Sequence, residues 1–382
     1  MEQYDYIITG AGASGLMLAY RMAQDTFFDD KSILILDKEK NITNNRTWCF
    51  WEDGTGEWDH LLHKIWPKIY FGSDDYSQVI DADPYHYKMI RSAKFYQALW
   101  KIIDKKEHIK FLKASVNSIV EHDNQAEVIT DKGTFTGAKI LNSIVLNRDY
   151  LNQKKYPILQ QHFIGWFIKT DSEAFDDDIA TFMDFEIPQN GNTAFMYVLP
   201  TSKTEALFEY TLFSEKLLTN DAYENAIIDY LNKKGIKNYT IEESERGAIP
   251  MTSYKFHKQN TRHVLNIGTS GGWTKASTGY TFMNTTKKTK QLTEFLKSEN
   301  DLRKFTKLTK FWFYDLLLLD VLAKYNEDGP KLFSSLFRKT KIQTIFKFLD
   351  EESTFAEDLR IVTAVPPIRF VKALLKRMIY GV

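Results

Sequence analysis

A glycine-rich turn near the start of the chain has the residue types that hold the phosphates of a dinucleotide. In a strand-turn-helix unit, Gly10 permits the tight turn, Gly12 lets backbone N–H groups approach a pyrophosphate, and Gly15 lets the helix pack closely on the strand. Asp37 ends a second apolar run, where a carboxylate accepts from a ribose hydroxyl. The alternative is a glycine turn without a ligand. The predicted dinucleotide site consists of Gly10, Gly12, Ala13, Ser14, Gly15 and Asp37.

A single acid in a later apolar segment could supply a proton. Within the alternating segment 207–213, strand periodicity places Glu209 on one face and its neighbours Phe208 and Tyr210 on the other. An acid among such side chains has its charged form disfavoured, which raises its pKa and makes it a proton donor near neutral pH. The alternative is that Glu209 lies on the wet face of the sheet.

A second group of small residues follows the strand pattern at 264–268. Gly268, Gly271 and Gly279 stand in a segment that leads into a helix, and they allow a backbone to approach a ligand closely. Because this strand ends in glycines more than two hundred residues after the first turn, we expect the chain to return there to the cofactor domain. The three glycines are therefore candidates for a second cofactor contact, with an ordinary loop as the alternative.

The elements that must position these residues follow two periodicities. A continuous apolar run at 138–146 predicts a strand buried in the same parallel sheet as the first turn. Alternating segments predict an antiparallel sheet with one wet and one dry face. Its four strands are expected at 161–168, 180–185, 194–199 and 205–213. A helix capped by Asp221 is predicted at 221–233, and the pattern is helical from 284 onward.

Composition excludes several classes of protein. Lys and Arg together number 50, as do Asp and Glu, so the net charge does not indicate a nucleic-acid partner. Cys49 is the only cysteine, which rules out a disulfide framework and a cysteine-based metal site, and no metal site is predicted. The first strand pattern begins within five residues of the start, so no cleaved signal peptide is expected. No apolar run reaches the roughly 18 residues of a membrane-spanning helix.

Aromatic residues are unusually frequent. Phe, Tyr and Trp make up 14% of the chain, and several of them gather at 41–52, which we expect to form a loop lining a site. Either an aromatic pocket for a large apolar ligand or an aromatic core explains this content. At the C-terminus the basic residues Arg360, Arg369, Lys372, Lys376 and Arg377 interleave with apolar ones at helical spacing. Such a helix lies on an anionic membrane or packs on its own domain, and the pattern does not choose.

The motifs in this order resemble the flavin-dependent lycopene cyclase family, specifically lycopene beta-cyclases of the bacterial type. The resemblance extends over nearly the whole chain, although the glycine turn alone is shared by many flavoproteins. Position 210 departs from the family pattern, which usually has a second acid where this chain has Tyr210. The matching segments are the glycine turn, Thr47-Trp48-Cys49-Phe50, Leu207-Phe208-Glu209-Tyr210-Thr211, 247–252, Ser277-Thr278-Gly279-Tyr280 and 360–367.

The resemblance implies an α/β fold. A Rossmann-type FAD domain, similar to those of glutathione reductase and p-hydroxybenzoate hydroxylase, is expected with an antiparallel-sheet substrate domain and a helical C-terminal region. The expected division places 1–50, 91–150 and 247–295 in the FAD-binding domain, 51–90 and 151–246 in the substrate domain, and 296–382 in the helical region, which is a candidate for membrane contact.

The resemblance also implies a reaction. The linear ends of lycopene are protonated and close to beta-ionone rings, without net oxidation, by an isomerase (intramolecular lyase) that uses FAD in its reduced form with NAD(P)H as reductant. In the family the essential carboxylate corresponds to Glu209, acting as proton donor or as partner to a donating flavin. Tyr210 puts in doubt any mechanism that needs two adjacent acids. Since lycopene resides in bilayers, a peripheral or monotopic position on the cytoplasmic face of the membrane is expected, with either the basic tail or the helix at 311–322 in contact.

A redox enzyme of the same fold is the main competing hypothesis. Flavin monooxygenases usually have Asp-Gly after the central strand and Gly-Asp at the second flavin contact, whereas this chain has Leu141-Asn142-Ser143 and Gly268-Thr269. Both differences count against hydroxylation. A prenyl reductase is a further redox candidate of this fold. A flavin-binding sensor or a carotenoid carrier would bind the same molecules without catalysis.

Overall fold

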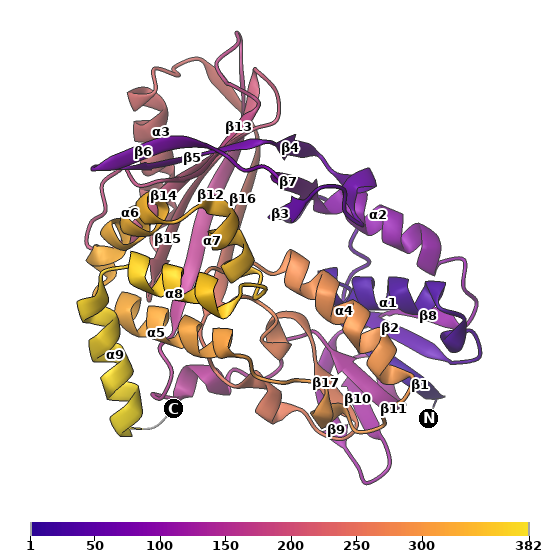
Figure 1. Ribbon diagram of the computed structural model, residues 1–382. Helices are drawn as coiled ribbons and strands as arrows, with labels where there is room; N and C mark the ends of the chain where they lie inside the picture. Colours follow the sequence, from indigo (N-terminus) through magenta and orange to yellow (C-terminus); the bar gives the residue numbers. More distant parts are fainter. Residues whose placement is uncertain (1, 381–382) are drawn as a thin grey trace.

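The first sheet carries the glycine turn at the end of its central strand. A computed structural model describes residues 2–380 of the protein (Figure 1). Strands β1, β2 and β8 are parallel, as are β11 beside β1 and β17 beside β11. The apolar run predicted at 138–146 therefore joins the parallel sheet over 138–142, the last part of β11, whereas 143–146 lie beyond the strand. The strands are β8 (Ile109–Lys113), β2 (Ile33–Asp37), β1 (Glu2–Thr9), β11 (Gly133–Asn142), β10 (Ala126–Thr130) and β9 (Val116–Glu121), with β17 (Val264–Asn266) on β11.

Three helices cover one side of this sheet. Helix α1 (Ala13–Gln24) follows the turn and packs between α2 (Ser92–Ile103) and α4 (Phe282–Leu296). Its buried residues include Leu16, Met17 and Ala19, which join Ile8 of β1 and residues of α2 and α4 in one apolar cluster. The chain therefore returns to the first turn near residue 264, as its second group of glycines predicted.

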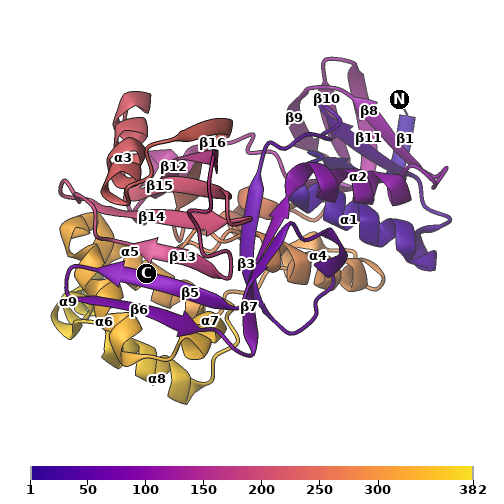
Figure 2. The same cartoon turned by 90° about the horizontal axis from the view of Figure 1, so that it is seen from above.

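The second sheet is largely antiparallel and is covered on both faces. Its order is β16-β12-β15-β14-β13-β5-β6, and only β13 and β5 run parallel. Helix α3 (Asn220–Lys233) packs on one face and the C-terminal helices pack on the other (Figure 2). The expected wet face is thus wrong. The strands are β16 (Tyr239–Met251), β12 (Leu159–Thr170), β15 (Glu205–Ser214), β14 (Thr193–Pro200), β13 (Ile179–Asp184), β5 (Lys68–Ser73) and β6 (Tyr76–Asp81).

A small third sheet lies between the two larger ones. It consists of β3 (Thr47–Asp53), β7 (Tyr85–Arg91) and β4 (Lys64–Trp66), all antiparallel (Figure 2). The predicted aromatic loop at 41–52 is therefore wrong over its second half, because pairing with β7 draws Thr47–Asp53 into a strand. The three-part division of the chain stays a prediction; residues 247–251, assigned by it to the cofactor domain, pair here with β12.

Residues 310–380 form a layer of short helices over the second sheet. The helix predicted at 221–233 is confirmed as α3, but its cap position is Thr219 rather than Asp221, which lies in the first turn. No helix within residues 2–380 combines the length and the apolar character needed to cross a bilayer. The C-terminal helices are α5 (Lys310–Lys324), α6 (Gly329–Lys339), α7 (Ile342–Leu349), α8 (Phe355–Ala364) and α9 (Pro367–Tyr380).

Candidate active site

Glu209 lies on the face of β15 that is turned toward the C-terminal helices. Its neighbours Phe208 and Tyr210 belong to the opposite apolar cluster, under α3, as the alternation of the strand predicted. Leu207, two residues before Glu209, packs in the cluster shared with α5–α7. The sheet thus places one acid in the interior layer between strands and helices.

The surroundings of Glu209 keep its carboxyl protonated. The hydroxyl of Thr211 donates to Oε1 of Glu209 at 2.8 Å. Burial, followed by the negative charge of Glu245, raises the pKa of Glu209 to about 8. Because a carboxyl with this pKa holds its proton at neutral pH, Glu209 has the property required of a general acid.

Tyr210 cannot take the place of a second acid beside Glu209. It is 4% exposed and lies on the α3 side of the sheet, 6.2 Å from the ring of Tyr223. Adjacent residues of a strand point to opposite faces, so no side chain at position 210 of this strand reaches the space in front of Glu209. The missing second acid at this position therefore leaves the face of Glu209 unaltered.

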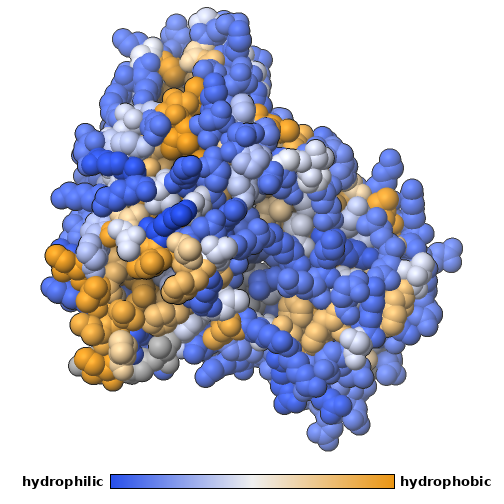
Figure 3. Space-filling model, in the orientation of Figure 1, coloured by the Kyte–Doolittle hydropathy of each residue, from blue (hydrophilic) through white to orange (hydrophobic). Residues whose placement is uncertain are grey.

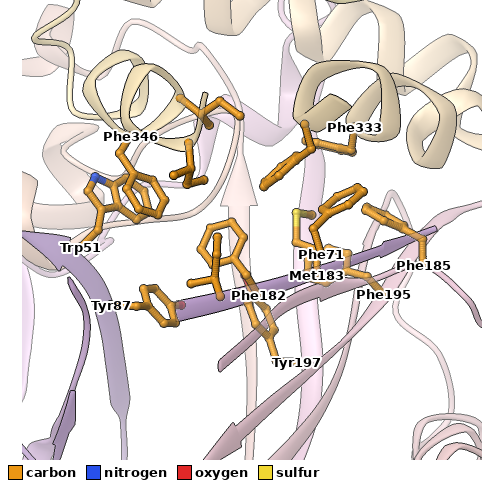
Figure 4. Close-up of a cluster of buried hydrophobic side chains, with 14 of the residues drawn as sticks. Trp51, Phe71, Tyr87, Phe182, Met183, Phe185, Phe195, Tyr197, Phe333 and Phe346 are labelled. Atoms are coloured by element: carbon orange, nitrogen blue, oxygen red, sulfur yellow. The ribbon is translucent and has the colours of Figure 1, made fainter. Parts of the chain in front are cut away.

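Aromatic rings gather beside Glu209. Tyr197 is paired with Glu209 across β14 and β15, and its hydroxyl lies 3.4 Å from that of Tyr280. The rings of Trp51 and Tyr280 meet edge to face, with 4.7 Å between their centroids. The Trp51 ring also stacks on that of Phe346 in α7, with 4.6 Å between centroids. Figure 4 shows Trp51, Tyr197 and Phe346 between the helices and the strands. Such rings present their negative faces to a cation.

An apolar cavity of about 340 Å³ leads away from this aromatic group. The cavity lies between the second sheet and all five C-terminal helices. Tyr197 and Tyr280 line its end at the sheet, while Val362, Phe370 and Leu374 line it from α8 and α9. An apolar ligand in this space would contact Tyr197, the residue paired with Glu209 on the neighbouring strand.

A buried ion pair fixes the loop that carries Tyr280. Nζ of Lys275 lies 3.1 Å from Oδ2 of Asp315 on α5, and the hydroxyl of Ser277 donates to Oδ1 of Asp315 at 2.8 Å. Burial raises the pKa of Asp315. The pair ties this loop to the helical layer, and so it holds one wall of the cavity in place.

The first glycine turn has the shape expected for a pyrophosphate site. Gly10 has φ +95°, and a Cβ on Gly15 would lie 1.9 Å from the carbonyl oxygen of Gly10, so only glycine allows α1 to approach β1 so closely. A Cβ on Gly12 would meet no atom within 4 Å, and no side chain caps α1. The N–H groups at Ala13 and Ser14 therefore begin a helix whose N-terminus faces open space, which fits an anion.

Asp37 ends β2 beside this turn. Its Oδ2 accepts from the backbone N–H of Ala11 at 2.5 Å. The carboxylate is thus next to the phosphate turn, at the strand end where a ribose hydroxyl is bound in dinucleotide folds. Its role as a ribose ligand stays a prediction.

The second glycine turn meets the first. A Cβ on Gly268 would lie 2.3 Å from Oγ of Ser14 in α1, and Gly271 closes against the carbonyl of Asn266. Gly279, by contrast, closes against Oε1 of Gln161 in the second sheet. Gly268 therefore adjoins the first glycine turn. Gly271 allows the backbone of the second turn to fold closely on itself, and Gly279 lies where this segment contacts β12 of the second sheet.

Sequence reasoning missed one acid of the site. Glu245 on β16 lies across β12 from Glu209, and the hydroxyl of Thr47 donates to its Oε2 at 2.7 Å. Charged residues around Glu245 resemble a solvated edge strand, so only the pairing of β16 with β12 could have revealed it. No group of His, Cys, Asp and Glu side chains within residues 2–380 is arranged to hold a metal ion.

Comparison with known proteins gives a family match over nearly the whole chain. The family described as "Lycopene cyclase protein" matches residues 5–375. The lycopene beta-cyclase of Pantoea ananas is 26% identical over 257 residues, which make up 65% of this chain and 63% of that protein. The matched part is thus less than two thirds of that relative.

Solved structures share the fold across their length. A geranylgeranyl bacteriochlorophyll reductase-like protein from Thermoplasma acidophilum aligns with a TM-score of 0.61 and 11% identity, covering 100% of this chain and 98% of that one. A variant of the halogenase PltM in complex with FAD aligns with a TM-score of 0.56 and 12% identity, covering 90% and 79%. The predicted fold, an FAD-enzyme architecture with a helical C-terminal region, is confirmed.

Proposed function

This chain belongs to the lycopene cyclase family, and we propose that it is a lycopene beta-cyclase of carotenoid biosynthesis. The proposed reaction converts the linear ends of lycopene to beta-ionone rings and leaves the oxidation state of the hydrocarbon unchanged. One observation carries the proposal: Glu209, a carboxyl whose pKa is raised to about 8, is paired across β14 and β15 with Tyr197, which lines an apolar cavity. An acid in a dry aromatic site suits the protonation of an alkene.

In the proposed mechanism Glu209 gives its proton to the terminal double bond of the substrate. The tertiary cation that results is attacked by the neighbouring double bond, which closes the ring, and a proton then leaves. The ring faces of Tyr197, Tyr280 and Trp51 stabilise the cation by about 1 to 2 kcal/mol each in a desolvated site. The apolar wall excludes the water that would otherwise capture the cation.

The residues of the two turns fit the dinucleotide part of FAD. In this proposal Gly10, Gly12 and the N-terminus of α1 hold the pyrophosphate, and Asp37 holds a ribose hydroxyl. Bound in its reduced, anionic form, the flavin would supply negative charge to the site. NAD(P)H is the proposed reductant that keeps it in that form.

A redox enzyme is the second candidate, because the solved structures with this fold include a reductase-like protein and a halogenase. The two candidates differ in the amount of NAD(P)H used. An isomerase consumes NAD(P)H only to reduce the flavin, whereas a reductase or monooxygenase consumes one equivalent for each product. Consumption in proportion to product would overturn the cyclase proposal, and lycopene bound unchanged under reducing conditions would indicate a carrier or sensor.

The Glu209→Gln variant tests the acid directly. Glutamine keeps the size of the side chain and cannot donate a proton to carbon, so cyclisation is expected to fall by at least about a hundredfold while flavin remains bound. Glu205→Gln, on the same face of β15, is the matched control and keeps its activity. Retained cyclisation in Glu209→Gln would remove Glu209 from the mechanism.

We also propose that α8 and α9 rest on the cytoplasmic face of a membrane. Figure 3 shows apolar surface gathered where Figure 1 places these two helices. Phe355, Ile368, Met378 and Ile379 are 67–75% exposed there. The same helices line the cavity, so a lipid-soluble substrate could enter from the bilayer without crossing water.

Side-chain exposure favours α9 over the other candidate for membrane contact, the helix at 311–322. The apolar residues of α5 are buried or partly buried, and α9 packs on it. Of the basic tail residues, Arg377 pairs with Asp320 and Arg369 with Asp328, so both serve the fold. The exposed basic residues are Arg360, Lys372 and Lys376.

Vesicle binding tests the membrane proposal. The double variant Ile368→Glu with Met378→Glu is expected to abolish sedimentation with anionic phospholipid vesicles, because it places two charges in the exposed patch. The matched control changes Ile42 and Leu217, which are 51% and 54% exposed elsewhere, to glutamate and should sediment normally. Equal sedimentation of both double variants would rule out this patch as the anchor.

A further inference from the structure

Two carboxyl groups of the second sheet lie on either side of a glycine, a position that has no side chain. Gly165 of β12 is paired with Glu209 of β15 on one side and with Glu245 of β16 on the other. Residues paired across neighbouring strands share a face, so both acids belong to the face turned toward the helices. At about 4.8 Å between strands, their Cα atoms are about 10 Å apart. Gly165 places no side chain between them.

The empty position is needed for this arrangement. A Cβ at Gly165 would lie 2.9 Å from Cδ1 of Leu207 and 3.3 Å from both Cβ and Cγ of Glu209. The side chain of Glu209 therefore leans over the glycine, toward β16. A gap of this size lets both carboxyl groups approach a flat end group lying over Gly165.

The two acids have different surroundings. Glu209 receives one hydrogen bond, from Thr211, and its other titratable neighbours are Cys49 and the tyrosines 197 and 280. Glu245 receives a hydrogen bond from Thr47. Burial raises the pKa of Glu245, opposed by Thr47 and by the positive charge of Arg91 and Arg46, while Glu243 adds a negative charge.

Arg91 strengthens this difference. Its side chain is mostly buried and forms an ion pair with Glu243. The guanidinium carbon lies 3.9 Å from the centroid of the Phe167 ring, and Nε has no hydrogen-bond partner within residues 2–380. The guanidinium lowers the pKa of Glu245 and so favours its carboxylate, whereas it is not among the charges that shift the pKa of Glu209. When the environments of two carboxyls differ in this way, one serves as acid and the other as base.

We propose that Glu245 is the base that completes the cyclisation begun by Glu209. This inference rests on the proposed cyclase function. Glu209 transfers its proton to the inner carbon of the terminal double bond, which leaves a tertiary cation on the outer carbon. The neighbouring alkene forms the new ring bond to this cationic carbon, and the charge moves to the far carbon of that alkene. The carboxylate of Glu245 then takes the proton from the ring carbon that joins the polyene, and the C–H electron pair becomes the ring double bond.

The hydrocarbon gains one proton and loses one, so its formula does not change and no oxidant or reductant is required for these steps. After the reaction Glu245 is protonated and Glu209 is ionised. Return of the proton from Glu245 to Glu209, across Gly165, restores the starting state for the next turnover. Since the cation can lose a proton from more than one carbon, the position of the base determines which ring isomer forms.

The test compares Glu245→Gln with the wild-type protein, using lycopene in liposomes and reduced FAD. We expect the rate to fall at least tenfold and the remaining product to contain rings with the double bond at other positions. Glu245→Asp should restore the wild-type ring isomer in part. A residue with a purely structural role would change the rate without changing the ratio of ring isomers.

Glu242→Gln is the matched control, because Glu242 is exposed on the same strand. Flavin content and the urea midpoint of each variant show whether it is folded. A folded Glu245→Gln protein with wild-type rate and isomer ratio would overturn the inference and leave the cyclase proposal intact. If the wild-type protein forms no ring from lycopene, the proposed function itself fails.

Discussion

Ionisation of Glu209 should destabilise the folded protein at alkaline pH, and Glu209→Gln should remove this effect. The pKa of Glu209 is about 8 in the folded protein, against 4.5 for a free glutamate. Because the folded-state pKa is the higher one, the folded state binds more protons between these values. The stabilisation is fully present below pH 4.5 and is lost as the pH rises through 8.

The size of the effect follows from the difference between the two pKa values. Each pH unit between them changes the free energy of unfolding by about 1.4 kcal/mol for one proton. From pH 6 to pH 9 the wild-type protein should therefore lose about 2 kcal/mol through Glu209, allowing for the partial exposure of this side chain. Glu209→Gln does not titrate and should lack this loss.

Urea unfolding followed by tryptophan fluorescence at pH 6, 7, 8 and 9 measures the difference. The control is again Glu205→Gln, whose carboxyl lies 3.2 Å from Lys169 in an exposed ion pair. The control curve should parallel the wild-type curve, while the Glu209→Gln curve diverges from it. Parallel curves for all three proteins would refute the conclusion that Glu209 is protonated at neutral pH, and with it its role as acid.

Three further predictions concern the cofactor turn, a buried histidine and the last helix. Gly15→Ala should lose FAD on desalting, seen in the flavin absorbance, because its Cβ would lie 1.9 Å from the oxygen of Gly10. Burial lowers the pKa of His162 to about 4, so acidification from pH 7 to pH 5 should lower the free energy of unfolding, measured in urea, by about 2 kcal/mol. The His162→Gln variant should lack this loss. Arg377→Ala leaves Asp320 without its ion-pair partner and should weaken the packing of α9 on α5 by about 3 kcal/mol. Faster limited proteolysis of α9 would show this loss.

Features set by neighbouring residues could be predicted from the sequence. The strand-turn-helix at Gly10–Gly15, four strands of the second sheet (β12 to β15) and the side of β15 that carries Glu209 all follow from local periodicity and glycine placement. The return of the chain to the first sheet near Val264 was predicted for the same reason. Such signals depend on residues a few positions apart, and packing against other elements did not override them.

Features set by long-range pairing could not be predicted. The alternation at 161–213 indicated a wet face, but α3 and the C-terminal helices cover both sides. Thr47–Asp53 has no clear period and becomes a strand only through β7. β16 was missed because the charged residues at 242–246 lack the apolar alternation of the other strands, although on the last strand of a sheet such charges protect an open edge.

The second acid illustrates why a motif read along the chain is an incomplete description of a site. The family pattern places a further acid next to the essential one, yet strand geometry turns position 210 toward α3 and away from Glu209. A partner on the same face must come from another strand of the sheet at the same register. Gly165 and Glu245 meet this condition although they are 44 and 36 residues from Glu209 along the chain. The chemistry of Glu209 therefore depends on the register of β12 with both of its neighbours.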